Sequence, residues 1–96
     1  MQLHASAISA WEIAIKVHKG KLGLPSAPRI WWETFLYSYG VNEVAVTGTI
    51  AMNAVEQELP HADPADRIIV ATARSLGAQL VTADNLLRKA LPFAIW

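Results

Sequence analysis

The sequence predicts an α/β domain in which a parallel sheet packs against helices. Short apolar segments typical of strands alternate with longer segments of helical periodicity, in the order β-α-α-β-α-α-β-α-β. Strands that are separated by helices usually pair in parallel, because the chain crosses back over the sheet before it pairs again. The chain has 96 residues, 53% of them hydrophobic, which is enough for one domain with its own core.

We expect the first strand at residues 2–6 and the first helix at residues 9–20. Ser9 and Glu12 have the S-x-x-E spacing of a capping box, which predicts that the helix begins at Ser9. Gly20 is expected to end this helix. The helical spacing is carried by Trp11, Ile15 and His18, with Ala14 beside them.

The segment of residues 29–40 predicts a second helix with an aromatic face. The aromatic residues on this face are Trp31, Trp32, Phe35 and Tyr39. Neighbouring residues of a helix point about 100° apart. We therefore expect one of the two adjacent tryptophans to pack inside the domain and the other to lie at a contact between chains, where aromatic residues are enriched. A strand is expected next, at residues 42–46.

The second half of the chain contains the best-defined helix, at residues 63–76. Asp63 is expected as its N-cap, Pro64 as its first residue and Gly77 as the residue after its end. The other elements expected in this half are a helix at 49–59, a strand at 78–84, a helix at 85–91 and a strand at 93–96.

Composition excludes several classes of protein. Eight acidic residues balance eight basic ones, which argues against a tight, non-specific nucleic-acid binder. The chain has no cysteine, so disulfides, thiolate zinc sites and thiol nucleophiles are excluded. No apolar run reaches the roughly 18 residues that a membrane span needs, and the N-terminal residues do not resemble a signal peptide. We expect a soluble cytoplasmic protein.

Carboxylates recur where strands give way to helices. Glu12, Asp63, Asp66 and Asp84 each follow a predicted strand or lie near the start of a predicted helix. In a parallel sheet these positions meet at the carboxyl edge of the strands, where ligands bind. Taken singly, each acid has a structural explanation as a helix cap, a partner of the helix dipole or a surface ion pair. Taken together, they suggest a site for Mg²⁺ or Mn²⁺, which prefer oxygen ligands. Both explanations stay open at this point.

Other motifs add little. His4, His18 and His61 are scattered and lack the spacing of zinc ligands. The sequence has no glycine-rich phosphate loop, no G-x-S-x-G and no HExxH. Four basic residues are candidate contacts for a phosphate backbone: Lys16, Lys19, Lys21 and Arg67. Arg67 stands out among them because it follows Asp66.

Two long motifs resemble PIN-domain proteins, specifically the VapC-type toxins of bacterial toxin–antitoxin pairs. "SAISAWEIAIKVHKGKLGLP" is similar to the segment after the family's second strand, and "HADPADRIIVATARSLGAQLVTAD" is similar to its second signature. The resemblance covers nearly the whole chain. It implies a single PIN-like domain over residues 1–96, an α/β/α sandwich on a parallel sheet. It also implies a Mg²⁺- or Mn²⁺-dependent endoribonuclease that cuts single-stranded RNA and is inhibited by an antitoxin protein.

The resemblance also implies roles for individual residues. Glu12, Asp66 and Asp84 match the metal-binding acids of the family and are the expected catalytic residues. Asp63 is expected to cap its helix, and Lys16 and Arg67 are candidate substrate contacts. The aromatic helix is expected to help line the groove where the antitoxin docks.

The sequence departs from the family at its start. Family members begin with a central strand that ends in an aspartate, followed by a helix, whereas Met1 falls where the second family strand begins. No acid precedes Glu12. The missing central strand would leave two strands beside a gap, and unpaired buried backbone groups are costly. Three resolutions stay open: direct pairing of these strands, a second chain that fills the gap and makes a homo-oligomer, or a natural protein with an earlier start.

Three hypotheses about function follow. The first is a VapC-like ribonuclease whose activity is impaired by the absent aspartate. The second is a PIN remnant that binds protein partners and cleaves RNA weakly or not at all. The third, based on helix capping alone, is a small α/β domain without chemistry, and the two motifs argue against it.

Overall fold

The computed structural model of the chain describes residues 3–57, 63–77 and 80. The elements follow the order predicted from the sequence: β1 (Leu3–Ser6), α1 (Ala7–His18), α2 (Pro28–Tyr39), β2 (Val41–Val44), α3 (Gly48–Glu56) and α4 (Pro64–Leu76). The last predicted strand–helix–strand unit, residues 78–96, lies outside the described residues apart from Leu80. No helix in the described part is long and apolar enough to cross a membrane.

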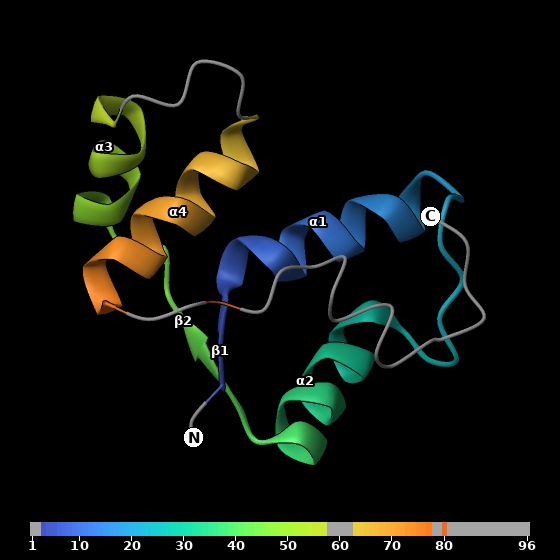
Figure 1. Cartoon of the computed structure of the whole chain (residues 1–96). Helices are drawn as coiled ribbons and strands as arrows, with labels where there is room; N and C mark the ends of the chain where they lie inside the picture. Colours follow the sequence, from blue (N-terminus) through green and yellow to red (C-terminus); the bar gives the residue numbers. More distant parts are fainter. Residues whose placement is uncertain (1–2, 58–62, 78–79, 81–96) are drawn as a thin grey trace.

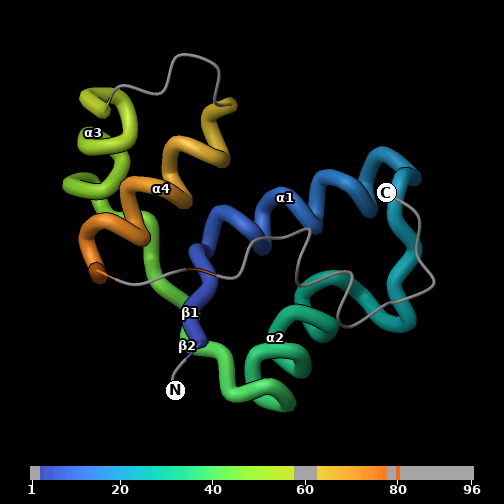
Figure 2. Tube along the Cα trace, viewed as in Figure 1, coloured from blue at the N-terminus to red at the C-terminus, as the bar shows by residue number. Residues whose placement is uncertain are grey.

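The two strands form a parallel pair, with Leu3 opposite Val41 and Ser6 opposite Val44. In Figure 1 this pair lies between α2 and the two helices α3 and α4. The tube in Figure 2 shows α1 starting at the carboxyl end of β1, and α1 packs against both α2 and α4. This arrangement confirms the predicted α/β fold with a parallel sheet between helices.

Helix α1 begins earlier than the capping box predicts. Ser6 is the N-cap, and its side chain accepts a hydrogen bond from the backbone N–H of Ile8 at 3.2 Å. Ser9 lies inside the first turns and is fully buried, so the predicted box of Ser9 and Glu12 is wrong. The helix starts directly where β1 ends, because the strand already gives Ser6 the extended backbone of an N-cap.

The buried side of α1 also differs from the predicted stripe. Ser9 and Ile13 are buried, whereas Trp11 and His18 are exposed. The periodicity predicted the helix correctly and its inward face incorrectly.

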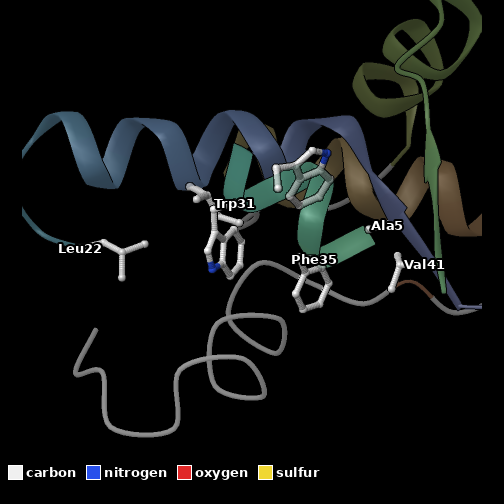
Figure 3. Packing of buried hydrophobic residues seen from close by; sticks show 7 residues of the cluster. Ala5, Leu22, Trp31, Phe35 and Val41 are labelled. Carbon is white, nitrogen blue, oxygen red and sulfur yellow. The ribbon is translucent and has the colours of Figure 1, made fainter. Parts of the chain in front are cut away.

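Both tryptophans of α2 are buried, each with 7% exposure, so the prediction that one lies at a surface contact is wrong. The Trp31 ring stacks on Phe35, which stacks in turn on Tyr39. The Trp32 indole Nε1 donates a 2.6 Å hydrogen bond to Glu43 on β2. Figure 3 shows the core around these rings, with Ala5, Leu22 and Val41. Two adjacent tryptophans can both be buried because α2 packs against α1 and also against β2.

Helices α3 and α4 pack on each other around Ile50, Ala54 and Ala71. The predicted ends of α4 are confirmed. Asp63 is the N-cap, Pro64 is the first residue, and Gly77 adopts the left-handed conformation at φ 63° that stops the helix. Helix α4 also packs against α1 and β1, and its first residues line a groove with the middle and the end of α1.

Candidate functional site

A groove of about 380 Å³ lies between α1 and the start of α4. It carries two carboxylates, Glu12 from α1 and Asp63 from the N-cap of α4. These residues are far apart in the sequence and meet because α1 packs against α4. The other lining residues are Trp11, Ile15, Lys16, Lys19, Lys21, Pro64 and Ala65.

Local structure determines where each acid lies. Glu12 is half-buried in the second turn of α1, the helix that begins at the carboxyl end of β1. Asp63 holds the first turn of α4, because its Oδ1 accepts a 2.8 Å hydrogen bond from the backbone N–H of Asp66. Asp63 is therefore the predicted cap and also part of the groove.

Asp66 is exposed in the first turn of α4, three residues after Asp63, and is not among the residues that line the groove. Asp84 lies outside the described residues. The structure thus brings Glu12 and Asp63 together and leaves Asp66 close to them in sequence. That Glu12, Asp66 and Asp84 converge on one metal ion stays a prediction.

The groove offers carboxylate oxygens, the type of ligand that a hard divalent cation prefers. Mg²⁺ is commonly bound through one or two carboxylates, with water and substrate phosphate completing its coordination. Glu12 and Asp63 supply two carboxylates in one groove, whereas Asp66 lies in the first turn of α4 and does not line it. Among the residues with described positions, no group of three or more acidic, histidine or cysteine side chains could hold a metal ion.

The basic residues divide into two groups. Lys16, Lys19 and Lys21 line the groove with the carboxylates. Arg67 instead reaches the end of α3, where its Nη1 donates to the carbonyl oxygens of Ala54 and Gln57 at 3.4 and 3.3 Å. Lys16 lines the groove and Arg67 does not, and a substrate contact by either residue stays a prediction.

Two residues of the groove carry less weight in the sequence than in the structure. Asp63 is one of the four carboxylates considered for a metal site but is expected mainly as a helix cap, and Trp11 is expected only as part of the helical periodicity. Trp11 directly precedes Glu12 in the sequence, and Asp63 lies three residues before Asp66. This closeness in sequence to predicted site residues is the signal that could have assigned Trp11 and Asp63 to the groove.

A second, larger groove of about 680 Å³ lies between α1 and α2. Its walls are mainly apolar, with Trp11 and Ala14 on one side and Trp32 and Leu36 on the other. Trp11 lines both grooves and so stands on the ridge between them.

Comparison with known proteins adds two matches. The PIN domain family matches residues 2–90 of the chain. Ribonuclease VapC22 of Mycobacterium tuberculosis (strain ATCC 25618 / H37Rv) is 36% identical over an alignment of 101 residues, which covers 99% of this chain and 75% of the relative. No solved structure matches the chain at a significant level.

Proposed function

The chain belongs to the PIN domain family, and from this membership we propose that it is a VapC-type, metal-dependent endoribonuclease. The substrate is single-stranded RNA, and the groove between α1 and α4 is the active site. One observation carries the proposal: Glu12 and Asp63, from distant parts of the chain, line a single groove together with three lysines.

Glu12, Asp66 and Asp84 are the residues that would hold Mg²⁺ or Mn²⁺, with Asp63 beside them. A bound ion of this kind supplies an activated water and stabilises the leaving oxygen of a phosphodiester. The carboxylates would hold this cation through their oxygen atoms. Asp63 also fixes the first turn of α4, because its cap bond holds the backbone of Asp66. The lysines balance the negative charge of an incoming phosphate.

We further propose that the chain is the toxin of a toxin–antitoxin pair. Its partners are an antitoxin protein and a second copy of the chain, and it acts in the cytoplasm. The similarity to a protein named Ribonuclease VapC22 supports the ribonuclease part of this proposal.

A second candidate function is a protein-binding module with weak catalysis or none. The apolar groove between α1 and α2 favours it, because exposed apolar surface of this kind is typical of partner binding. The two candidates differ in what they require of the carboxylates. Only the ribonuclease needs them to hold a metal ion.

The test is to titrate Mn²⁺ into the protein, follow thermal unfolding, and assay cleavage of a single-stranded RNA. We expect Mn²⁺ to raise the melting temperature, since a ligand that binds only the folded state stabilises it. Asp66→Asn should abolish this rise and lower the cleavage rate by more than about 100-fold, because even residues that merely support metal ligands are worth about 10–100-fold.

Glu56→Gln is the matched control, because Glu56 is an exposed acid at the end of α3 and does not line the groove. It should leave both the Mn²⁺ response and cleavage unchanged. If Asp66→Asn behaves like this control, the proposed role of Asp66 is wrong. A wild-type chain with neither a Mn²⁺ response nor cleavage supports the binding module instead.

A further inference from the structure

Trp11 has an unusual position for a tryptophan. Its side chain is 58% exposed, whereas Trp31 and Trp32 are each 7% exposed in the core. It stands beside Glu12 in the sequence and lines the same groove. A large flat ring left open next to a candidate active site is a surface on which a nucleic-acid base can stack.

The three lysines of this groove are brought together by the way α1 ends. The N–H of Gly20 donates to the carbonyl of Val17 at 3.0 Å, and the N–H of Lys21 donates to the carbonyl of Lys16 at 2.9 Å. This pair of bonds is a Schellman motif, which folds the chain back over the last turn of the helix. Lys21 therefore returns to the groove that Lys16 and Lys19 already line.

Gly20 makes this turn possible. Its φ is +71°, in the left-handed region that residues with a side chain rarely adopt. A Cβ at this position would meet nothing within 4 Å, so the requirement for glycine is conformational and does not come from crowding. The turn brings Lys21 to the groove of Lys16 and Lys19, so three lysines face two carboxylates there, and this excess of positive charge favours an anionic ligand.

We propose that the groove binds single-stranded RNA through this surface, with the Trp11 ring stacked on a base and Lys16, Lys19 and Lys21 paired with backbone phosphates. The inference rests on the proposed ribonuclease function and names the residues that hold its substrate. Lys19 lies two turns beyond Glu12, about 10 Å along the helix axis, so the surface extends past the carboxylates to neighbouring nucleotides. Stacking needs an unpaired base, which selects single strands over duplex RNA.

Binding can be measured without cleavage, by fluorescence anisotropy of a labelled eight-nucleotide RNA in the presence of EDTA. We expect Trp11→Ala to weaken binding about tenfold and Trp11→Phe to keep most of the affinity. The double variant Lys19→Gln/Lys21→Gln should lower the slope of log affinity against log salt by about 1.4, since each phosphate contact on a single strand contributes about 0.7.

Two further variants make the test specific. Gly20→Ala should weaken binding about as much as Lys21→Gln alone, because it disturbs the turn that carries Lys21. Arg74→Gln removes one positive charge from the last turn of α4, where Arg74 bonds to Gln57 and does not line the groove. It should leave RNA affinity unchanged. Circular dichroism melts of each variant establish that it is folded.

The outcomes separate this inference from the proposed function. Unchanged RNA affinity in both folded Trp11→Ala and the double lysine variant overturns it. It is also overturned if a polyglutamate peptide binds as tightly as RNA and is insensitive to Trp11→Ala, because the groove then takes an acidic protein. RNA binding with the expected pattern, but no Mn²⁺-dependent cleavage, supports the inference and contradicts the ribonuclease. Mn²⁺-dependent cleavage together with unchanged RNA binding in all variants supports the ribonuclease and contradicts the inference.

Discussion

Asp63 caps α4 and also lines the groove with Glu12, so a single carboxylate serves both folding and the site. Capping requires only an oxygen acceptor, which asparagine also offers, whereas metal binding requires the negative charge. The two roles can therefore be separated by comparing two substitutions at the same position.

Asp63→Asn should keep the free energy of unfolding nearly unchanged and weaken the Mn²⁺-induced rise in melting temperature. Asp63→Ala should also lower the free energy of unfolding, by about 1 kcal/mol, because the N–H of Asp66 loses its acceptor. Urea unfolding with and without Mn²⁺ measures both effects. An unaltered Mn²⁺ response in Asp63→Asn would limit Asp63 to capping.

Ser9 differs from Asp63 in that its hydroxyl group makes no hydrogen bond among the described residues. Its Oγ is fully buried and has no hydrogen-bond partner within the described part of the chain. A buried hydroxyl without a partner costs about 1–3 kcal/mol. Ser9→Ala is expected to raise the free energy of unfolding by about 1 kcal/mol, as measured by urea titration.

Ser6→Ala is the control for this prediction. It removes the hydroxyl that caps α1 and should lower the free energy of unfolding by about 1 kcal/mol. A loss of stability in Ser9→Ala would mean that the Ser9 hydroxyl does have a partner in the folded protein.

At the scale of elements, Arg67 joins α3 to α4. Its Nη1 donates to the last carbonyls of α3, while Gln57 Nε2 donates back to the carbonyl oxygen of Arg67 at 2.7 Å. A cation at the C-terminus of a helix also favours the helix dipole. The apolar contact between these helices consists of Ile50, Ala54, Ala71 and Ile68, and the bonds of Arg67 and Gln57 add a polar connection to it.

Arg67→Gln is expected to lower the free energy of unfolding by about 1.5–3 kcal/mol, the usual value of hydrogen bonds to a charged group. Arg74→Gln removes an exposed arginine that also bonds to Gln57 and should cost less than about 1 kcal/mol. Chemical denaturation of both variants tests the difference. If Arg67→Gln instead left stability intact and lowered RNA affinity, Arg67 would be the substrate contact that the sequence suggested.

For the whole molecule, we can compare which structural features the sequence alone predicts and which it does not. The ends of α4 are predictable because Asp63, Pro64 and Gly77 act within one turn of the backbone. The start of α1 is not, because Ser6 and Ser9 are both good caps and the end of β1 decides between them. Local signals predict an element, and contacts with other elements choose between equivalent local signals.

The same reasoning applies to the core and the site. Two adjacent tryptophans suggest that one must be exposed, yet Trp31 faces the core cluster while Trp32 finds Glu43 on β2. The sequence predicts that Glu12 and the start of α4 lie near each other, because parallel strands place those positions at one edge, and the groove contains both Glu12 and Asp63. The place of Trp11 could not be predicted, since it depends on the packing of α1 on α4. Lys21 was a candidate phosphate contact, but the Schellman turn that brings it to the groove was not predicted.

The parallel register of β1 and β2 also constrains how the domain assembles. Each residue of β1 pairs with a residue that follows both α1 and α2 in the sequence. No hairpin can join the strands, so the chain must close a long loop before the first ladder bond forms. We therefore expect strand pairing to follow the packing of the two intervening helices, so that a substitution in either helix affects the sheet without touching it.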